Sequence, residues 1–179
     1  MKLRLLPVVV TILASSAVLF GGWFAYQSYA MEDPFLKETA AIVGVADAAV
    51  ELGRDQATVH VTLAEGAKLR EAYQAVIEAG RASLGKRNVV VDVVGEGGTS
   101  PALEEWWSGA LFDVAQAMET KQYARIPERL KELAASQGNL QVKTEMDETN
   151  VYIALTDGPN SKYVVLPRTA ATMGVWPNE

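Results

Sequence analysis

The pattern of hydrophobic and polar positions divides the chain into two parts. Near the N-terminus is a long uncharged run, and the rest of the chain shows the periodicities of helices and strands. Leu5–Phe24 carries no charged residue, and a run of about 20 apolar residues is the length that crosses a hydrocarbon core. Lys2 and Arg4 precede it, and basic residues beside a span are typically retained on the cytoplasmic side. The pattern predicts a membrane anchor in residues 1–30, with lipid contacted through residues 5–24, the N-terminus cytoplasmic and the domain outside.

A cleaved signal peptide is the other interpretation of the same segment. Ser28-Tyr29-Ala30 places small residues at the two positions that a signal peptidase inspects. Cleavage there would make the domain a secreted one. The apolar run is longer than the ~7–15 residues of a signal peptide, which favours the retained anchor.

Beyond the anchor, the residue periods predict five elements before Gly95. Thr58–Leu63 alternates apolar and polar positions and forms a hairpin with the segment before it. Glu65–Arg81 repeats apolar residues at helical spacing. Val89–Val94 is almost wholly apolar, as in a strand buried on both faces. The predicted elements are a helix over Phe35–Val43, strands over Ala49–Leu52 and Thr58–Leu63, a helix over Glu65–Arg81 and a strand over Val89–Val94.

The second half predicts two helices and then three strands. Ser100 is a good helix N-cap, and Pro101 fits the first helical turn because it needs no amide hydrogen there. The predicted elements are helices over Pro101–Met118 and Ile126–Ser136, and strands over Leu140–Met146, Val151–Leu155 and Tyr163–Leu166.

The element order predicts an α+β domain over residues 31–168. The order is α-β-β-α-β-α-α-β-β-β, and the two hairpins require antiparallel pairs. We expect a mixed, largely antiparallel sheet with helices packed on one side. Residues 169–179 show no period and are predicted to be a loose C-terminal tail.

The order and pattern of residues 35–94 resemble a known kind of module. The segments IVGVADAAVEL, ATVHVTL, LREAYQAVIEAG and NVVVDVV are similar to the ring-building-motif domains of membrane-anchored bacterial secretion and sporulation proteins, and to alkaline-shock-type domains. The resemblance implies a small α/β module that acts through its surfaces, and it carries no catalytic residue over. The second half departs from this pattern.

Charge and composition restrict the function further. The formal net charge is −6, and it becomes −8 when Lys2 and Arg4 are set aside. An acidic surface repels phosphates, so we expect no nucleic-acid partner. The chain has no cysteine, which excludes disulfides, thiol catalysis and thiolate metal sites. We predict no cofactor and no metal.

The loop GEGGTS, Gly95–Ser100, sits where phosphate-binding loops lie, between a strand and a helix. A Walker-type loop needs a lysine before its Ser or Thr, and a dinucleotide fingerprint needs a third glycine where Ser100 stands. Glu96 would also oppose an anion. We therefore predict that the loop only turns the chain and that Ser100 caps the helix.

An alternative function would use a cleft beside this loop for ligand binding or hydrolysis. Its candidate residues are Asp92, Glu96, Ser100 and Glu104. Asp92 interrupts a buried strand, which predicts a sheet edge, a partner such as Arg81 or Arg87, or a functional role. A hydrolase normally shows a nucleophile–base or metal set, and the sequence shows none. His60 is predicted to be an ordinary surface histidine.

Trp106 and Trp107 are the candidate partner surface. Adjacent helical positions cannot both point along one narrow stripe. Core packing of both is favoured, but an exposed one would mark a binding surface because tryptophan dominates interface hot spots. We predict a non-enzymatic, membrane-anchored extracytoplasmic domain that acts in protein–protein interaction or envelope assembly, with a cleft near Gly95–Ser100 as the alternative. Its partner is an unknown envelope protein or a second copy of the chain.

Overall fold

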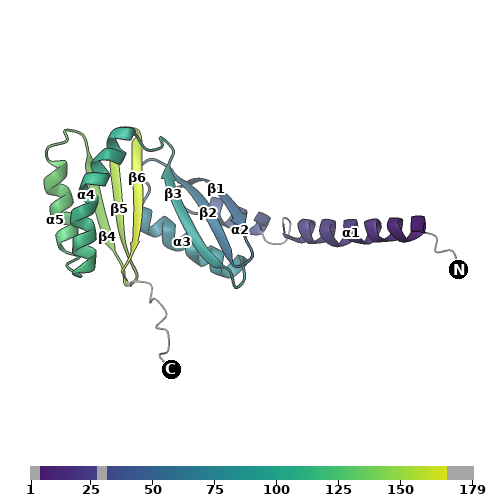
Figure 1. Cartoon of the computed structure of the whole chain (residues 1–179). Helices are drawn as coiled ribbons and strands as arrows, with labels where there is room; N and C mark the ends of the chain where they lie inside the picture. Colours follow the sequence, from purple (N-terminus) through teal and green to yellow (C-terminus); the bar gives the residue numbers. More distant parts are fainter. Residues whose placement is uncertain (1–4, 28–31, 169–179) are drawn as a thin grey trace, which may run out of the picture.

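The computed structural model describes residues 5–27 and 32–168 (Figure 1). The predicted cleavage motif Ser28–Ala30 and the predicted tail at 169–179 lie outside these residues. The helices are α1 (Leu5–Gln27), α2 (Asp33–Ala40), α3 (Leu69–Ser83), α4 (Pro101–Glu119) and α5 (Arg125–Ala134). The strands are β1 (Val45–Leu52), β2 (Gln56–Leu63), β3 (Asn88–Gly95), β4 (Gln141–Met146), β5 (Asn150–Asp157) and β6 (Asn160–Pro167).

The predicted membrane anchor is contradicted by the structure. Over residues 5–27 and 32–168, no helix is long and apolar enough to cross a membrane. The prediction counted residues without a charge, whereas a span also needs enough apolar length for a core of roughly 30 Å. The membrane localisation predicted from this anchor is contradicted by the same finding.

The first sheet combines β1, β2 and β3 and is covered on one face. β1 and β2 are antiparallel, and β2 and β3 run parallel, so β2 is the central strand. The inward residues of β2 alternate as predicted, and Val59 and Leu63 are buried against Val76 of α3 and Phe35 of α2. The apolar side chains along one face of α3 and the inward side chains of β2 thus form the core of this half.

The other face of the first sheet is open, which corrects the prediction for β3. Val90, Asp92 and Val94 are exposed, while the residues between them are half-buried against the core. The wholly apolar sequence of this strand predicted burial on both faces. It lies instead at an edge of a three-stranded sheet with helices on one side only.

The second sheet is a β4–β5–β6 antiparallel meander packed against α4 and α5. Its central strand is buried on both faces. Ile153 and Leu155 face α4 and α5, whereas Tyr152 packs against Tyr73 of α3. Helices therefore cover both faces of the second sheet but only one face of the first, and two small sheets replace the single predicted one. The α+β class and the predicted element order are confirmed.

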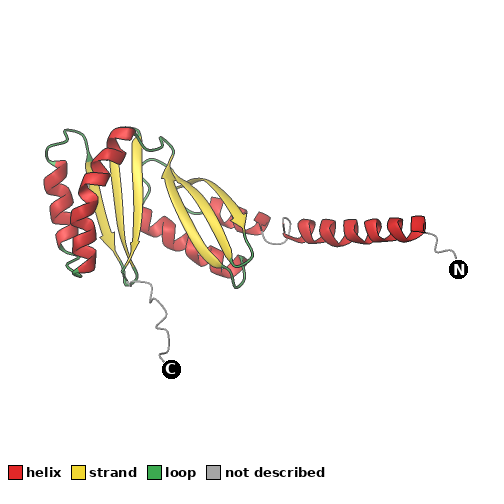
Figure 2. Cartoon of the chain, viewed as in Figure 1, coloured by secondary structure: helices red, strands yellow, loops and turns green. Residues whose placement is uncertain are grey.

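The two sheets lie side by side, with β3 and β6 as neighbouring edges (Figure 2). They are joined where the end of β3 meets the start of β6. The hydroxyl of Thr99 donates a 2.9 Å hydrogen bond to the carbonyl of Ser161, whose amide donates to the carbonyl of Gly98 at 2.9 Å. The GEGGTS loop is thus the joint between the two halves of the domain.

Candidate functional site

The loop before α4 turns the chain and caps the helix, as predicted. The hydroxyl of Ser100 accepts the amide hydrogen of Leu103 at 3.2 Å, and Pro101 occupies the first turn. The glycines have a tertiary role that the sequence did not reveal. A Cβ at Gly95 would overlap the hydroxyl of Ser161, and a Cβ at Gly97 would overlap the carbonyl oxygen of Pro159. Glycine lets the β5–β6 hairpin dock against the loop.

The four residues of the alternative cleft are engaged in different contacts. Asp92 lies 3.2 Å from Nδ1 of His60 on the open sheet face, rather than on Arg81 or Arg87. Glu104 binds Lys162 at 2.7 Å, and Ser100 caps α4. Glu96 alone among the four lines the cleft of about 390 Å³ beside the loop. The structure therefore gives no favourable geometry for a ligand-binding or hydrolytic centre built from these residues.

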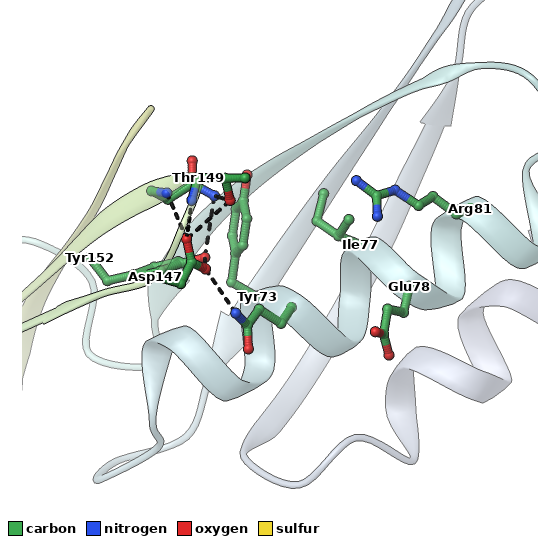
Figure 3. A pocket seen from close by; sticks show the side chains of 9 residues that line it. Tyr73, Ile77, Glu78, Arg81, Asp147, Thr149 and Tyr152 are labelled. Carbon is green, nitrogen blue, oxygen red and sulfur yellow. Dashed lines mark hydrogen bonds between the residues drawn. The ribbon is translucent and has the colours of Figure 1, made fainter. Parts of the chain in front are cut away.

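A cleft of about 460 Å³ between α3 and the β4–β5 turn holds the most densely hydrogen-bonded carboxylate of the described chain, Asp147 (Figure 3). One of its oxygens accepts from the amides of Thr149 and Asn150, both at 2.7 Å. The other accepts from the hydroxyl of Tyr152 at 2.6 Å and from the side-chain amide of Gln74 at 2.8 Å. Asp147 thereby ties the turn to β5 and to α3.

These contacts move the titration of Asp147 and Tyr152 away from neutral pH. Burial acts to raise the pKa of Asp147, but the hydrogen bonds from Tyr152, Asn150, Thr149 and Gln74 outweigh it and hold the pKa well below its usual range. Burial and the bond to Asp147 raise the pKa of Tyr152 to about 12. A general base works best with a pKa near the operating pH. The pair is therefore suited to holding structure rather than to transferring protons.

The sequence identified the turn around Asp147 but missed this cluster. Asp followed by Thr and Asn two and three residues later is a signal for a side-chain-capped turn. The alternation of the strand places Tyr152 on the same side as the turn. Gln74, however, lies 73 residues before Asp147, and no local pattern in the sequence connects the two.

The two adjacent tryptophans lie in different environments. Trp107 is 8 % exposed and packs with Leu103 and Ile153 in the core beneath α4. Trp106 is half-buried and forms a wall of two grooves, one of about 260 Å³ and one of about 600 Å³. The larger groove runs between α4 and the end of α5, where Leu133 forms its other side. Core packing, which was favoured for both, applies fully to Trp107 alone.

Two further residues of α4 extend this exposed region and were missed by the sequence analysis. Phe112 is 81 % exposed, and Gly109 lies between it and Trp106. Residues three apart are neighbours on a helix surface, so the three follow one another across α4. A Cβ at Gly109 would meet no atom within 4 Å, although glycine inside a helix costs roughly 0.5–1 kcal/mol relative to alanine. We call Trp106, Gly109 and Phe112 the α4 interaction face.

The described residues contain no group of three or more His, Asp or Glu side chains placed to hold a metal ion. Comparison with known proteins finds no family model, no curated protein and no solved structure that matches the chain. The resemblance of residues 35–94 to ring-building-motif modules thus stays a prediction.

Substitution of the two tryptophans by phenylalanine distinguishes their roles. We expect Trp107→Phe to lower the free energy of unfolding by about 1 kcal/mol or more, because it leaves unfilled volume in the core. Trp106→Phe should cost less than Trp107→Phe, because Trp106 is only half-buried at the edge of the same core. Urea unfolding followed by circular dichroism measures both. Equal losses at the two positions would place Trp106 in the core and contradict the assignment.

Proposed function

We propose that this chain is a protein-interaction module that binds its partner through the α4 interaction face and acts without catalysis. The observation that carries the proposal is the exposure of Phe112, six residues after the half-buried Trp106, on a helix whose opposite face already fills the core. Burying one such aromatic side chain contributes about 1.5–3 kcal/mol. A partner that covers Trp106 as well would gain affinity from tryptophan, a residue type that is enriched in interface hot spots.

The shape of this region also supports binding. The groove of about 600 Å³ begins at Trp106 and is lined by small residues of α4, Ala102, Gly109 and Ala110. Small side chains let a partner approach the backbone of α4 closely, and the indole beside them offers a large and rigid contact. The amphipathic helix-in-groove mode of recognition uses surfaces of this kind.

The resemblance of residues 35–94 favours the same class of function. It implies a module that acts through its surfaces and assembles with other proteins. Under this proposal the first half is the scaffold that supports Tyr73 against Tyr152 and, through β5, the sheet beneath α4. The second half, which departs from the module pattern, supplies the contact surface.

Photocross-linking in the cell that makes the protein tests the proposal. A photoreactive phenylalanine analogue in place of Phe112 is expected to form a covalent adduct with one defined protein. The same analogue in place of Arg54, an exposed residue of the turn between β1 and β2, is the control and should form little adduct. A Gly109→Trp background should abolish the adduct, because the indole would obstruct the face at a position where a Cβ meets no atom within 4 Å. Equal labelling at positions 112 and 54, or labelling that survives Gly109→Trp, would refute the proposal.

A further inference from the structure

We infer that the cleft at the joint between the two sheets is a binding site for a small organic cation that carries a primary ammonium group. This cleft has a volume of about 390 Å³ and lies beside the GEGGTS loop, between the carboxyl ends of β2 and β3 and the β5–β6 hairpin. Clefts of a few hundred Å³ are the size that small ligands occupy. The site uses no residue of the α4 interaction face, so it is independent of the proposed function.

The two acidic residues of the cleft come from neighbouring strand ends. β2 and β3 run parallel, with Leu63 paired to Gly95, so the segments that follow them leave the same edge of the sheet. Glu65 lies two residues after β2 and Glu96 one residue after β3, and both are exposed and line the cleft. Because adjacent strands are roughly 4.8 Å apart, this edge brings two negative charges to one wall. Ligands commonly bind outside the carboxyl ends of parallel strands.

The β5–β6 hairpin supplies three hydroxyl-bearing residues to the other wall. Thr156 and Ser161 are cross-strand partners, and Tyr163 follows Ser161 by two positions, so the three side chains lie on one face of the second sheet. This face points toward the first sheet, because a Cβ at Gly95 would meet both Ser161 and Tyr163. Three side chains with hydroxyl groups therefore converge on the cleft.

The hydroxyl of Ser161 points to a ligand. Ser161 is only 7 % exposed, and its Oγ has no hydrogen-bond partner among the described residues. Buried polar groups are almost always hydrogen-bonded, since a buried hydroxyl without a partner costs free energy. The Oγ keeps some accessible surface on the cleft, so a ligand can reach it. The hydroxyls of Thr156 and Tyr163 also have no partner in this part of the chain, and a ligand with several hydrogen-bond donors would satisfy all three.

The charge of the cleft decides the class of ligand. No lysine or arginine of residues 5–27 and 32–168 lines it, so its carboxylates attract a cation and repel an anion. An ammonium group has three donors for carboxylate and hydroxyl oxygens, and the ring of Tyr163 offers a cation–π contact. A metal ion fits less well, because Ca²⁺ takes about 6–8 oxygen ligands. The described residues contain no group of three or more acidic or histidine side chains that could hold one.

Titration calorimetry of the full chain with 1,4-diaminobutane tests the inference, and 1,4-butanediol is the neutral control of the same length. We expect the diamine to bind with an affinity that falls as the salt concentration rises, and the diol to give no binding heat. Glu96→Gln should weaken diamine binding by about tenfold, because it removes a charged hydrogen-bond acceptor. Glu119→Gln removes the same charge at an exposed position at the end of α4, so it is the matched control and should leave the affinity nearly unchanged.

Ser161→Ala separates a binding role of the hydroxyl from a structural one. The variant should bind the diamine several-fold more weakly. Its urea midpoint should not fall, because the hydroxyl has no hydrogen bond to lose within the described residues. The inference is overturned by a diol that binds as tightly as the diamine, or by equal effects of Glu96→Gln and Glu119→Gln. It is also overturned by a Ser161→Ala variant that loses stability but not affinity, or by the absence of binding heat at millimolar diamine.

Discussion

Gly97→Val is expected to lower the free energy of unfolding by about 3 kcal/mol, at the upper end of the usual cost of overpacking. A Cβ at this position would overlap the carbonyl oxygen of Pro159 in the β5–β6 turn. The obstacle is backbone rather than the end of a flexible side chain, so the hairpin must move away from the loop. That movement would disturb the hydrogen bonds between Ser161 and both Gly98 and Thr99. Urea unfolding of the variant measures the loss.

Gly138→Val is the matched control for this prediction. A Cβ at Gly138 would meet no atom within 4 Å, and its φ is not in the left-handed region, so the same substitution should cost much less there. Unfolding midpoints that shift equally in the two variants would contradict the role of Gly97 as a docking point. So would binding of ATP or NAD, detected by titration calorimetry, that Gly97→Val abolishes.

Asp147→Ala is expected to lower the free energy of unfolding by about 2–4 kcal/mol. The substitution removes the acceptor for the hydroxyl of Tyr152, a residue that is 1 % exposed, and for the amides of Thr149 and Asn150. Each buried donor left without an acceptor costs about 1–3 kcal/mol, and the exposed contacts of the turn contribute less. Glu148→Ala, in the same turn and exposed, is the control and should change little.

The pH dependence of stability checks the same assignment. The pKa of Asp147 is lower in the folded chain than its unfolded value of about 3.9. The folded state therefore binds fewer protons, and the contribution of Asp147 is fully present above about pH 4. It is lost as the pH falls through the folded pKa. Asp147→Asn should lack this loss, so its stability should approach that of the natural chain in acid. A constant difference between the two from pH 7 to pH 2 would contradict the role of the carboxylate.

Local pattern in the sequence determined the elements and their order. The alternation of β2 and the helical stripe of α3 are properties of consecutive residues, and they hold wherever the chain is placed. The cap at Ser100 depends on an amide only three residues away. The same local reasoning counted an uncharged run in α1 as a membrane span, because charge alone does not measure the length and apolar character that a span requires.

Tertiary structure decided which faces are covered. The period of β3 shows that Val90, Asp92 and Val94 share a face, but only the arrangement of the sheets shows that no helix lies on it. The sequence alone does not distinguish Trp106 from Trp107. The positions of α5 and the second sheet decide that Trp107 is buried and Trp106 only half-buried. Gly97 against Pro159, and Gln74 against Asp147, join residues more than 60 positions apart. Periodicity reports which residues lie together along one element, whereas burial and long-range hydrogen bonds depend on what the rest of the chain places opposite them.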